Sequence, residues 1–327
     1  MGLAVTTEGP EITGGWHSAA NSTLTRLLVV GGNGFIGQHI VRRALGLLWD
    51  VSSLNFSMPD PKNRIEGVRY LVADISDNLQ LRAALTANSF EYVVNCGGYI
   101  DHTLFSAGGR KVFDAHFSGA LNLVQLLDRK SLKAYINIGS SDEYGNSAAP
   151  QVEDLREAPI SPYSIGKVAA THLLEMLHKT ESFPGTTLRL FLVYGPGQDM
   201  RRFLPQIIKG CIENRSFPTS AGTQLRDFCF ITDVVDAVFR TFFCESARGQ
   251  SINIGSGDGV SIRQMIEIVR EHIGAGEPRY GEIPYRTGEN MALYGNVSKA
   301  KLLLNWAAGV PLQEGLQQTI NWYRDQH

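Results

Sequence analysis

Residues 27–37 read LLVVGGNGFIG, a short apolar run that leads directly into glycines spaced as GxxGxxG and then into an amphipathic segment. Gly31, Gly34 and Gly37 suit a tight turn, a close backbone approach to a pyrophosphate and the packing of a helix on a strand. The start of a helix also attracts an anion through its first backbone N–H groups. This stretch therefore predicts the strand, turn and helix that open a dinucleotide-binding domain.

Short apolar runs alternate with segments of helical spacing over the first 193 residues. The predicted strands are residues 26–30, 51–54, 69–73, 92–96, 134–139 and 186–193, and the predicted helices are residues 36–48, 79–85, 112–127 and 162–178. Such alternation is typical of an α/β fold. We expect a Rossmann-type, doubly wound parallel sheet, with its ligand sites beyond the carboxyl ends of the strands.

The alternation stops after about residue 193, where glycine, proline and charged residues become frequent. Helices are still expected over residues 203–213, 233–243, 261–272 and 312–324, the third opened by a capping box of Ser261 and Gln264. We expect residues 25–193 to form the Rossmann domain. Residues 194–327 then form mainly a smaller C-terminal substrate-binding lobe, with some segments returning to the sheet.

Composition narrows the classes of protein that fit. The formal net charge is −2, which favours neither a nucleic acid nor a membrane surface as partner. No apolar run approaches the ~20 residues of a spanning helix. Residues 1–24 lack a secretory pattern and are interpreted as a flexible extension. The four cysteines show no metal-type spacing, so we expect a cytoplasmic protein without a metal site.

The end of the second predicted strand bears on the choice of cofactor. An NAD enzyme usually presents an acid there to hold the free 2′-hydroxyl of the ribose. Here the strand ends at Asn55, with Ser57, Lys62 and Arg64 close by in sequence. An uncharged residue does not repel a 2′-phosphate, so NADP is favoured and NAD is possible. Asp60 is an argument for NAD.

Asp74 ends the third predicted strand, ahead of Ile75, and is a candidate partner for the adenine amino group. The alternative is that Asp74 caps the helix expected from residue 79. Six further residues belong to the candidate cofactor site, two in the glycine turn, two after the fourth strand and two in the helix expected over residues 162–178: Phe35, Ile36, Gly97, Gly98, Tyr163 and Lys167.

Residues 161–167, SPYSIGK, read as the start of a helix with Ser161 as its cap. Tyr163 and Lys167 are one turn apart and so share a face. A tyrosine needs its anion stabilised before it can act as an acid–base group near neutral pH, and a neighbouring ammonium does this. Ser140 directly follows the fifth predicted strand, at the edge of the sheet where catalytic residues are expected. These three residues form a candidate triad for proton transfer coupled to hydride transfer.

The chain resembles the extended short-chain dehydrogenase/reductase family, in its nucleotide-sugar branch of epimerases, dehydratases and 4-ketoreductases. The matching segments are residues 31–37, 139–145, 161–167, 188–197, 226–228 and 286–289. The resemblance implies that Tyr163 is the catalytic acid/base, that Lys167 assists it, and that Ser140, with Ser141 beside it, contacts the reacting hydroxyl. It also implies a homodimer formed through residues 112–127 and 162–178.

By the same resemblance the substrate is a nucleotide-diphosphate sugar. Arg226 and Arg286 are then expected to bind its diphosphate, and Glu289 its ribose; a guanidinium pairs well with phosphate oxygens. The alternative for each arginine is an ordinary surface ion pair. His102 is a further candidate substrate contact, although a loop histidine bonded within the protein is the plainer interpretation.

Three positions depart from the common pattern of the family. Asn55 replaces the usual acid, His116 replaces an asparagine near the nicotinamide, and Leu192 replaces an asparagine that often touches the substrate phosphate. Asp142, by contrast, falls where dehydratases carry a glutamate for proton shuttling, although reductases show similar loops. We therefore include Asp142 among the candidate catalytic residues.

The sequence favours an NADPH-dependent reductase of the C4 keto group of a nucleotide-linked sugar, with Tyr163 as proton donor. Asn55 carries this preference, because a net reductase consumes a diffusible cofactor and NADPH is the usual donor. The first alternative is an NAD-dependent 4-epimerase, and the second is a 4,6-dehydratase. An NADP-binding protein without catalysis is a further class, which the intact triad argues against.

Overall fold

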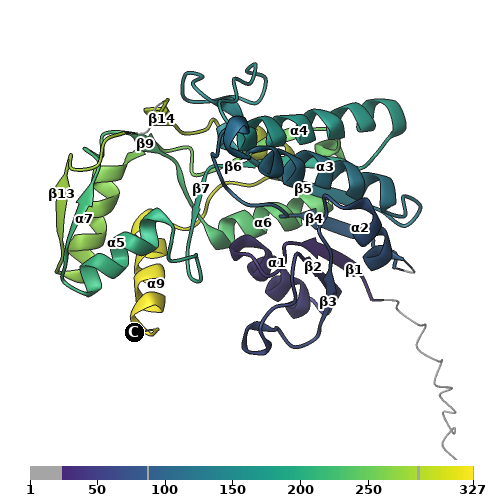
Figure 1. Ribbon diagram of the computed structural model, residues 1–327, viewed down its shortest axis with the longest axis horizontal. Helices are drawn as coiled ribbons and strands as arrows, with labels where there is room; N and C mark the ends of the chain where they lie inside the picture. The colour runs from purple at the N-terminus through teal and green to yellow at the C-terminus, as the bar shows by residue number, and fades with distance from the viewer. Residues whose placement is uncertain (1–23, 87, 286–287, 327) are drawn as a thin grey trace, which may run out of the picture.

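Seven parallel strands form the central sheet, in the order β11-β6-β5-β4-β1-β2-β3 (Figure 1). Their bounds are β1 Arg26–Val30, β2 Asp50–Asn55, β3 Val68–Val72, β4 Tyr92–Asn95, β5 Ala134–Ser140, β6 Gly185–Leu190 and β11 Ser251–Ile254. The strand order reverses between β1 and β4, which is the point where a doubly wound sheet binds its ligand. The predicted fold class is confirmed. The computed structural model describes residues 24–86, 88–285 and 288–326, so the predicted extension lies almost entirely outside the described residues.

Helices cover both faces of this sheet. One face carries α2 (Asn78–Leu85), α3 (Arg110–Leu126) and α4 (Pro162–Glu181), and the other carries α1 (Phe35–Gly46) and α6 (Ile231–Phe242) (Figure 1). Strand β1 shows why two layers form. Its side chains alternate, so that Leu28 and Val30 join the core under α2–α4 while Leu27 and Val29 join the core that includes α6. Buried alternation on both faces is what a central parallel strand requires.

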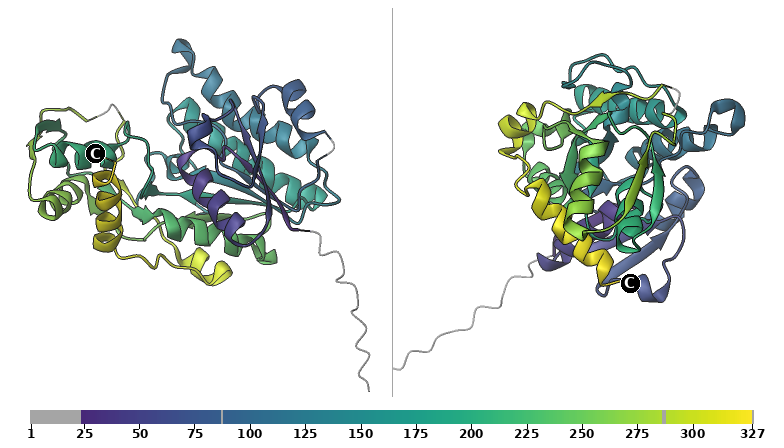
Figure 2. Two further views of the ribbon diagram at one scale, coloured as in Figure 1. Left: turned by 90° about the horizontal axis from the view of Figure 1, so that it is seen from below. Right: turned by 90° about the vertical axis from the view of Figure 1, so that its left-hand side faces the viewer.

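A second group of elements lies beyond the ends of the strands (Figures 1 and 2). Its helices are α5 (Phe203–Ile212), α7 (Ile262–Ile273) and α9 (Leu312–Arg324), with α8 (Ser298–Leu304) packed near β11. Its short strands are β7 Leu192–Tyr194, β8 Ser216–Thr219, β9 Leu225–Arg226, β10 Phe228–Phe230, β12 Val260–Ser261, β13 Glu277–Tyr280 and β14 Ala292–Leu293. Strand β11 and helix α6 follow residue 194 yet belong to the sheet layers. The division into two domains stays a prediction.

The helix caps follow the sequence closely. Ser161 caps α4 by accepting from the Ser164 backbone N–H at 3.1 Å, with Pro162 in the first turn. Ser261 and Gln264 form the predicted capping box at α7. One predicted strand is wrong, because residues 186–193 form two strands. After Leu190 the backbone changes partners: the Leu192 N–H donates to the Asp227 carbonyl, and β7 pairs with β10.

Candidate active site

The turn between β1 and α1 is built as the glycine spacing predicts. Gly31 has a φ of +73°, and its N–H donates to the Leu54 carbonyl at 2.7 Å. A Cβ on Gly37 would overlap the Gly31 carbonyl oxygen and lie 2.7 Å from the Gly32 Cα, so the helix start presses directly on the turn. Gly34 is the N-cap of α1 and offers no side-chain acceptor to the first amides of the helix. These amides are suited to a phosphate.

Phe35 and Ile36 are the first residues of α1, one residue earlier than the predicted helix start, and are half-buried against the core on that face of the sheet. Asn55 has a structural role in the glycine turn that the sequence did not predict. Its Oδ1 accepts from the Asn33 N–H at 2.9 Å and its Nδ2 donates to the Ser53 Oγ at 2.8 Å, so its amide ties β2 to the glycine turn. Asn55 is therefore a support of the turn, and its lack of charge is a weak argument for a 2′-phosphate.

The other basic and polar candidates at this edge are exposed. Ser57 and Arg64 both lie on the surface, and the Arg64 Nε donates to the Pro59 carbonyl at 3.1 Å.

Asp74 accepts from both the backbone N–H and the hydroxyl of Ser76, at 2.8 and 2.7 Å. Its alternative role as a helix cap is wrong, because Asp77 caps α2.

Ile75 and the glycines after β4 form the next wall of the candidate cofactor site. A Cβ on Gly97 would lie 2.8 Å from the Ile75 Cδ1, and one on Gly119 would lie 2.6 Å from the same atom. Gly98 has a φ of +96°, which an L-residue with a side chain rarely adopts. The Ile75 side chain thus needs Gly97 in the loop and Gly119 in α3 in order to fit between the two.

Ser140, Tyr163 and Lys167 come together at the carboxyl end of β5. All three are buried, and Ser140 is the last residue of the strand. The Lys167 Nζ donates to the Ile138 carbonyl at 2.6 Å and lies 5.9 Å from the centre of the Tyr163 ring. The predicted triad is therefore assembled in space, with its lysine held by the backbone of β5.

Burial sets the electrostatics of the triad. It raises the pKa of Tyr163, the nearby Asp142 raises it further, and a hydrogen bond with Ser140 opposes both. Burial also lowers the pKa of Lys167 to about 8, against the opposing field of Glu143. A cation that the sequence did not single out, Arg202, lowers the pKa of Tyr163 from the N-terminal end of α5.

The acids that follow Ser140 divide into two environments. Glu143 is fully buried: it accepts from the Ser140 N–H at 2.9 Å and from the Arg189 Nε at 2.8 Å, and Arg189 is buried as well. It therefore braces the turn. Asp142 is half-buried, and its carboxylate lies 3.9 Å from the His102 Nε2. Asp142, with the buried Ser141 before it, is the acid that remains near the reacting groups.

His102 stands on the open side of Tyr163. Its ring meets the Tyr163 ring edge to face at 5.8 Å between centroids, and its Nδ1 lies 3.4 Å from the Ser161 Oγ. His116 meets the same tyrosine from the buried side, at 4.9 Å. The sequence marked His116 only as a departure from a pattern, because a sequence gives no indication of which ring will face it.

Two of the expected substrate residues, one for the diphosphate and one for the ribose, form a pair with each other: Arg226 and Glu289. Arg226 makes an ion pair with Glu289, and its Nη1 donates to the Leu225 and Asn290 carbonyls at 2.7 and 2.8 Å. Both side chains are mostly buried. A substrate phosphate would therefore have to share Arg226 with Glu289. Arg286 lies outside the described residues.

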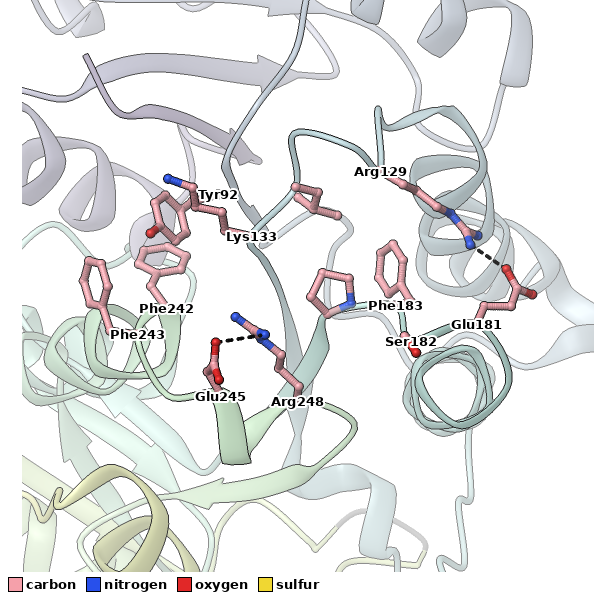
Figure 3. Close-up of a pocket in the computed structure, with 12 residues that line it drawn as sticks. Tyr92, Arg129, Lys133, Glu181, Ser182, Phe183, Phe242, Phe243, Glu245 and Arg248 are labelled. Atoms are coloured by element: carbon pink, nitrogen blue, oxygen red, sulfur yellow. Dashed lines mark hydrogen bonds and ion pairs between the residues drawn. The ribbon is translucent and has the colours of Figure 1, made fainter. Parts of the chain in front are cut away.

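The hollow drawn in Figure 3 lies elsewhere. It has a volume of about 550 Å³ and is lined by Tyr92, Lys133 and Phe183 at the amino ends of β4, β5 and β6. Its cations are engaged in ion pairs, such as that of Arg248 with Glu245. Tyr163 and Ser140 lie at the carboxyl ends, so this hollow is separate from the candidate site.

Two general findings complete the description. None of the helices in the described part of the chain has the length and apolar character needed to cross a membrane. Within residues 24–86, 88–285 and 288–326, no three His, Cys, Asp or Glu side chains are grouped so as to hold a metal ion.

Comparisons with known proteins show which family and which fold the chain resembles. The model of the NAD dependent epimerase/dehydratase family matches residues 27–255. A UDP-glucuronate 4-epimerase of Thermodesulfobacterium geofontis is 26% identical, over 91% of this chain and 96% of the relative. A dTDP-glucose 4,6-dehydratase of Xanthomonas campestris pv. campestris is 25% identical, over 90% and 92%. The structure of a Bacillus cereus UDP-glucuronic acid 4-epimerase with UDP-glucuronic acid and NAD is 25% identical, with a TM-score of 0.81 over 93% of this chain and all of that one.

Proposed function

The chain belongs to the NAD-dependent epimerase/dehydratase family, and from this premise we propose that it is a nucleotide-sugar 4-epimerase that retains NAD through each turnover. The observation that carries the proposal is the buried group of Ser140, Tyr163 and Lys167 at the carboxyl end of β5. Relatives that match along nine tenths of the chain are named for acting at C4 of a nucleotide sugar. We propose a UDP-sugar as the substrate because the 4-epimerases reported above are named for UDP-glucuronate.

The residues around the glycine turn fit NAD. The uncapped start of α1 suits the pyrophosphate, and Ile75, Gly97 and Gly98 follow strands β3 and β4 at the same edge of the sheet. Bound there, NAD would supply the acceptor and donor of the hydride of the sugar carbon. With Asn55 holding the turn, we propose NAD in place of the NADP that the sequence favoured.

In the proposed reaction, deprotonated Tyr163 takes the proton of the sugar 4-hydroxyl while the C4 hydride leaves. The Lys167 ammonium stabilises the tyrosinate, and Ser140 donates a hydrogen bond to the same sugar oxygen. Tyr163 then returns the proton when the hydride comes back to the opposite face of the carbonyl. The sugar is oxidised and then reduced at C4, so one turnover leaves the oxidation states of both the sugar and the cofactor unchanged.

A second candidate, a 4,6-dehydratase, is favoured by one observation. Asp142 lies beside Ser140 with its carboxylate half-exposed near His102, where it could remove or deliver a proton at a neighbouring sugar carbon. The 4-ketoreductase that the sequence favoured lacks comparable support, since the relatives reported above are named as 4-epimerases and a 4,6-dehydratase.

We propose three substrate contacts in addition to the triad. Arg226 and Arg286 bind the diphosphate, and Glu289 moves from Arg226 to the ribose when the substrate binds. Charge favours this exchange, because two phosphates attract a guanidinium more strongly than one carboxylate does. We also propose a homodimer through α3 and α4, which sedimentation of the purified chain tests.

The function is tested by assay of the purified protein. Acid extraction identifies any cofactor carried through purification, and incubation with UDP-glucuronate, UDP-glucose and dTDP-glucose follows. A 4-epimerase gives a mixture of C4 epimers with no net change at the absorbance of reduced nicotinamide. Stoichiometric oxidation of added NADPH by a 4-keto sugar would instead establish the reductase.

A further inference from the structure

We propose that His116 of α3 is a positioning residue: its ring holds the Tyr163 ring in place from the buried side and keeps water from that side of the phenol. The inference rests on the proposed acid–base role of Tyr163. His116 occupies a position at which the sequence showed only a departure from the family pattern, and its contacts give that departure a physical meaning.

The ring of His116 is fixed at two points. It meets the Tyr163 ring edge to face, with centroids 4.9 Å apart and planes at 83°. Its Nε2 lies 2.9 Å from the Tyr99 carbonyl oxygen. A carbonyl only accepts, so the Nε2 carries the proton and donates. His116 therefore links α3, the loop after β4 and the tyrosine of α4.

Two glycines make the space for this ring. A Cβ on Gly98 would lie 2.6 Å from the His116 Nδ1, and one on Gly166 would lie 3.2 Å from the His116 Cβ. Gly98 belongs to the loop after β4, and Gly166 belongs to α4, one residue before Lys167. The imidazole fills a slot between these elements and leaves little room for another orientation.

The ring is neutral, so it positions Tyr163 without exchanging protons with it. Burial lowers the pKa of His116 to about 3, and the charge of Lys167 lowers it further against the bond to Tyr99. Burial is also the largest cause that raises the pKa of Tyr163. Removing the His116 ring would admit water to the phenol and lower that pKa.

Other groups face Tyr163 as well, and they must stay unchanged in any test. Asp142 and Glu143 follow β5, Lys167 lies one turn along α4, Arg202 precedes α5, and His102 stands on the open side. His102 is the useful contrast. Its ring also meets Tyr163 edge to face, but it is exposed and therefore excludes little water.

The full-length protein can be tested without a substrate. Its tyrosines are replaced by a fluorotyrosine, whose more acidic phenol titrates in an accessible range, and the signal of position 163 is assigned by its loss in Tyr163→Phe. We expect His116→Ala to lower the pKa at position 163 by about one unit or more. His116→Phe, which restores an edge-on ring, should return most of the shift. An unchanged pKa in folded His116→Ala would overturn the proposal.

Two further variants guard against a trivial result. His116→Gln keeps a donor for the Tyr99 carbonyl but has no ring, so it should lower the pKa at position 163 as His116→Ala does. A wild-type pKa at position 163 in His116→Gln also overturns the proposal, even if His116→Ala fails to fold. His178 is the matched control, because its Nδ1 likewise bonds a carbonyl, that of Phe183, at 3.1 Å, and its ring packs against Gly249. His178→Ala should leave the pKa at position 163 unchanged.

Kinetics provide the second readout. With an identified nucleotide sugar, His116→Ala should lower kcat by about tenfold with little change in KM, because losing the fixed orientation of the Tyr163 ring outweighs the easier deprotonation of its phenol. His116→Phe should recover most of the loss. If no nucleotide sugar is turned over by the wild type, the proposed function fails while the fluorine titration still decides the role of His116. A rise in KM alone would assign His116 to substrate binding and contradict the proposal.

Discussion

Lys167 donates a hydrogen bond from its Nζ to the backbone carbonyl of Ile138, at 2.6 Å. The bond joins the one lysine of the catalytic group to the strand that also ends in Ser140. It fixes the ammonium at the carboxyl edge of the sheet, close to Tyr163, at the cost of burying a charge. The sheet itself therefore determines where the proposed cationic partner of Tyr163 lies.

This burial gives Lys167 a signature in the dependence of stability on pH. Its pKa is lowered from 10.5 to about 8, so between these pH values the unfolded chain binds a proton that the folded chain does not. The free energy of unfolding then rises with pH across this window. We expect the rise to be smaller in Lys167→Met, by up to about 3 kcal/mol over the window. Urea unfolding at several pH values measures it, and equal slopes in both proteins would disprove the assigned pKa.

Glu143 should matter to stability more than to chemistry. It is fully buried and bonded to Arg189, Thr171 and the Ser140 N–H. Glu143→Gln leaves Arg189 with a weaker partner, so we expect a loss of roughly 2–4 kcal/mol in the free energy of unfolding. Glu245→Gln is the control, since Glu245 is exposed and should change it by less than about 0.5 kcal/mol. If Glu143→Gln also changed the free energy of unfolding by less than about 0.5 kcal/mol, that result would contradict the bracing role of Glu143.

The helix α1 offers a matched pair of glycines. Gly37→Ala would force a methyl group into the Gly31 carbonyl, and we expect NAD binding to fall by about a hundredfold or the protein to be destabilised. Gly46→Ala, in the same helix, meets no atom within 4 Å. It should leave NAD binding unchanged and add up to about 1 kcal/mol of stability. Calorimetric titration with NAD separates the two, and wild-type affinity in Gly37→Ala would refute the phosphate-binding turn.

Asp142 distinguishes the two candidate reactions. A 4-epimerase needs no acid beyond the triad, so Asp142→Asn should keep kcat within about threefold. A 4,6-dehydratase needs a proton shuttle, and the same change should lower its kcat by about a hundredfold or more. Turnover of UDP- and dTDP-sugars, followed by chromatography of the products, gives the answer. A fall in kcat of about a hundredfold or more in Asp142→Asn would favour the 4,6-dehydratase over the 4-epimerase.

Tyr163→Phe tests the acid–base assignment itself. Removing the hydroxyl deletes the proton acceptor while the ring contacts with His102 and His116 remain. We expect kcat to fall by about a thousandfold or more, with NAD affinity within about threefold of the wild type. Single-turnover assays with NAD in excess show whether the loss lies in chemistry. Retention of most of the activity would remove Tyr163 from the mechanism.

Much of the fold could be predicted from the sequence because its signals are local. Glycine spacing identified the β1–α1 turn, apolar runs identified the strands of the central sheet except β11, and Ser161 and Ser261 marked helix starts. The pairing of strand β8 with β13, and of strand β9 with β14, could not be predicted in this way. Strands of two to four residues carry too few side chains for a period, and their partners lie far along the chain.

The candidate site shows the same limit. Ser140, Tyr163 and Lys167 could be named because each sits at a recognisable strand end or helix start. The environment of each could not, because Arg189 meets Glu143 from a strand 46 residues away. Asn55 was interpreted from its side chain alone, whereas its bonds to Asn33 and Ser53 determine its part in the structure.

The most direct test of the proposed 4-epimerase follows the hydrogen at C4. The purified protein is incubated with UDP-glucuronate or UDP-glucose carrying deuterium at that carbon, and the product is analysed by NMR. We expect the C4 epimer to form with deuterium still at C4, because a 4-epimerase returns the hydride to the carbon that released it. Deuterium found at C6 would indicate a dehydratase, and its loss to a nicotinamide released into solution would show a net oxidoreductase; either result would contradict the central claim.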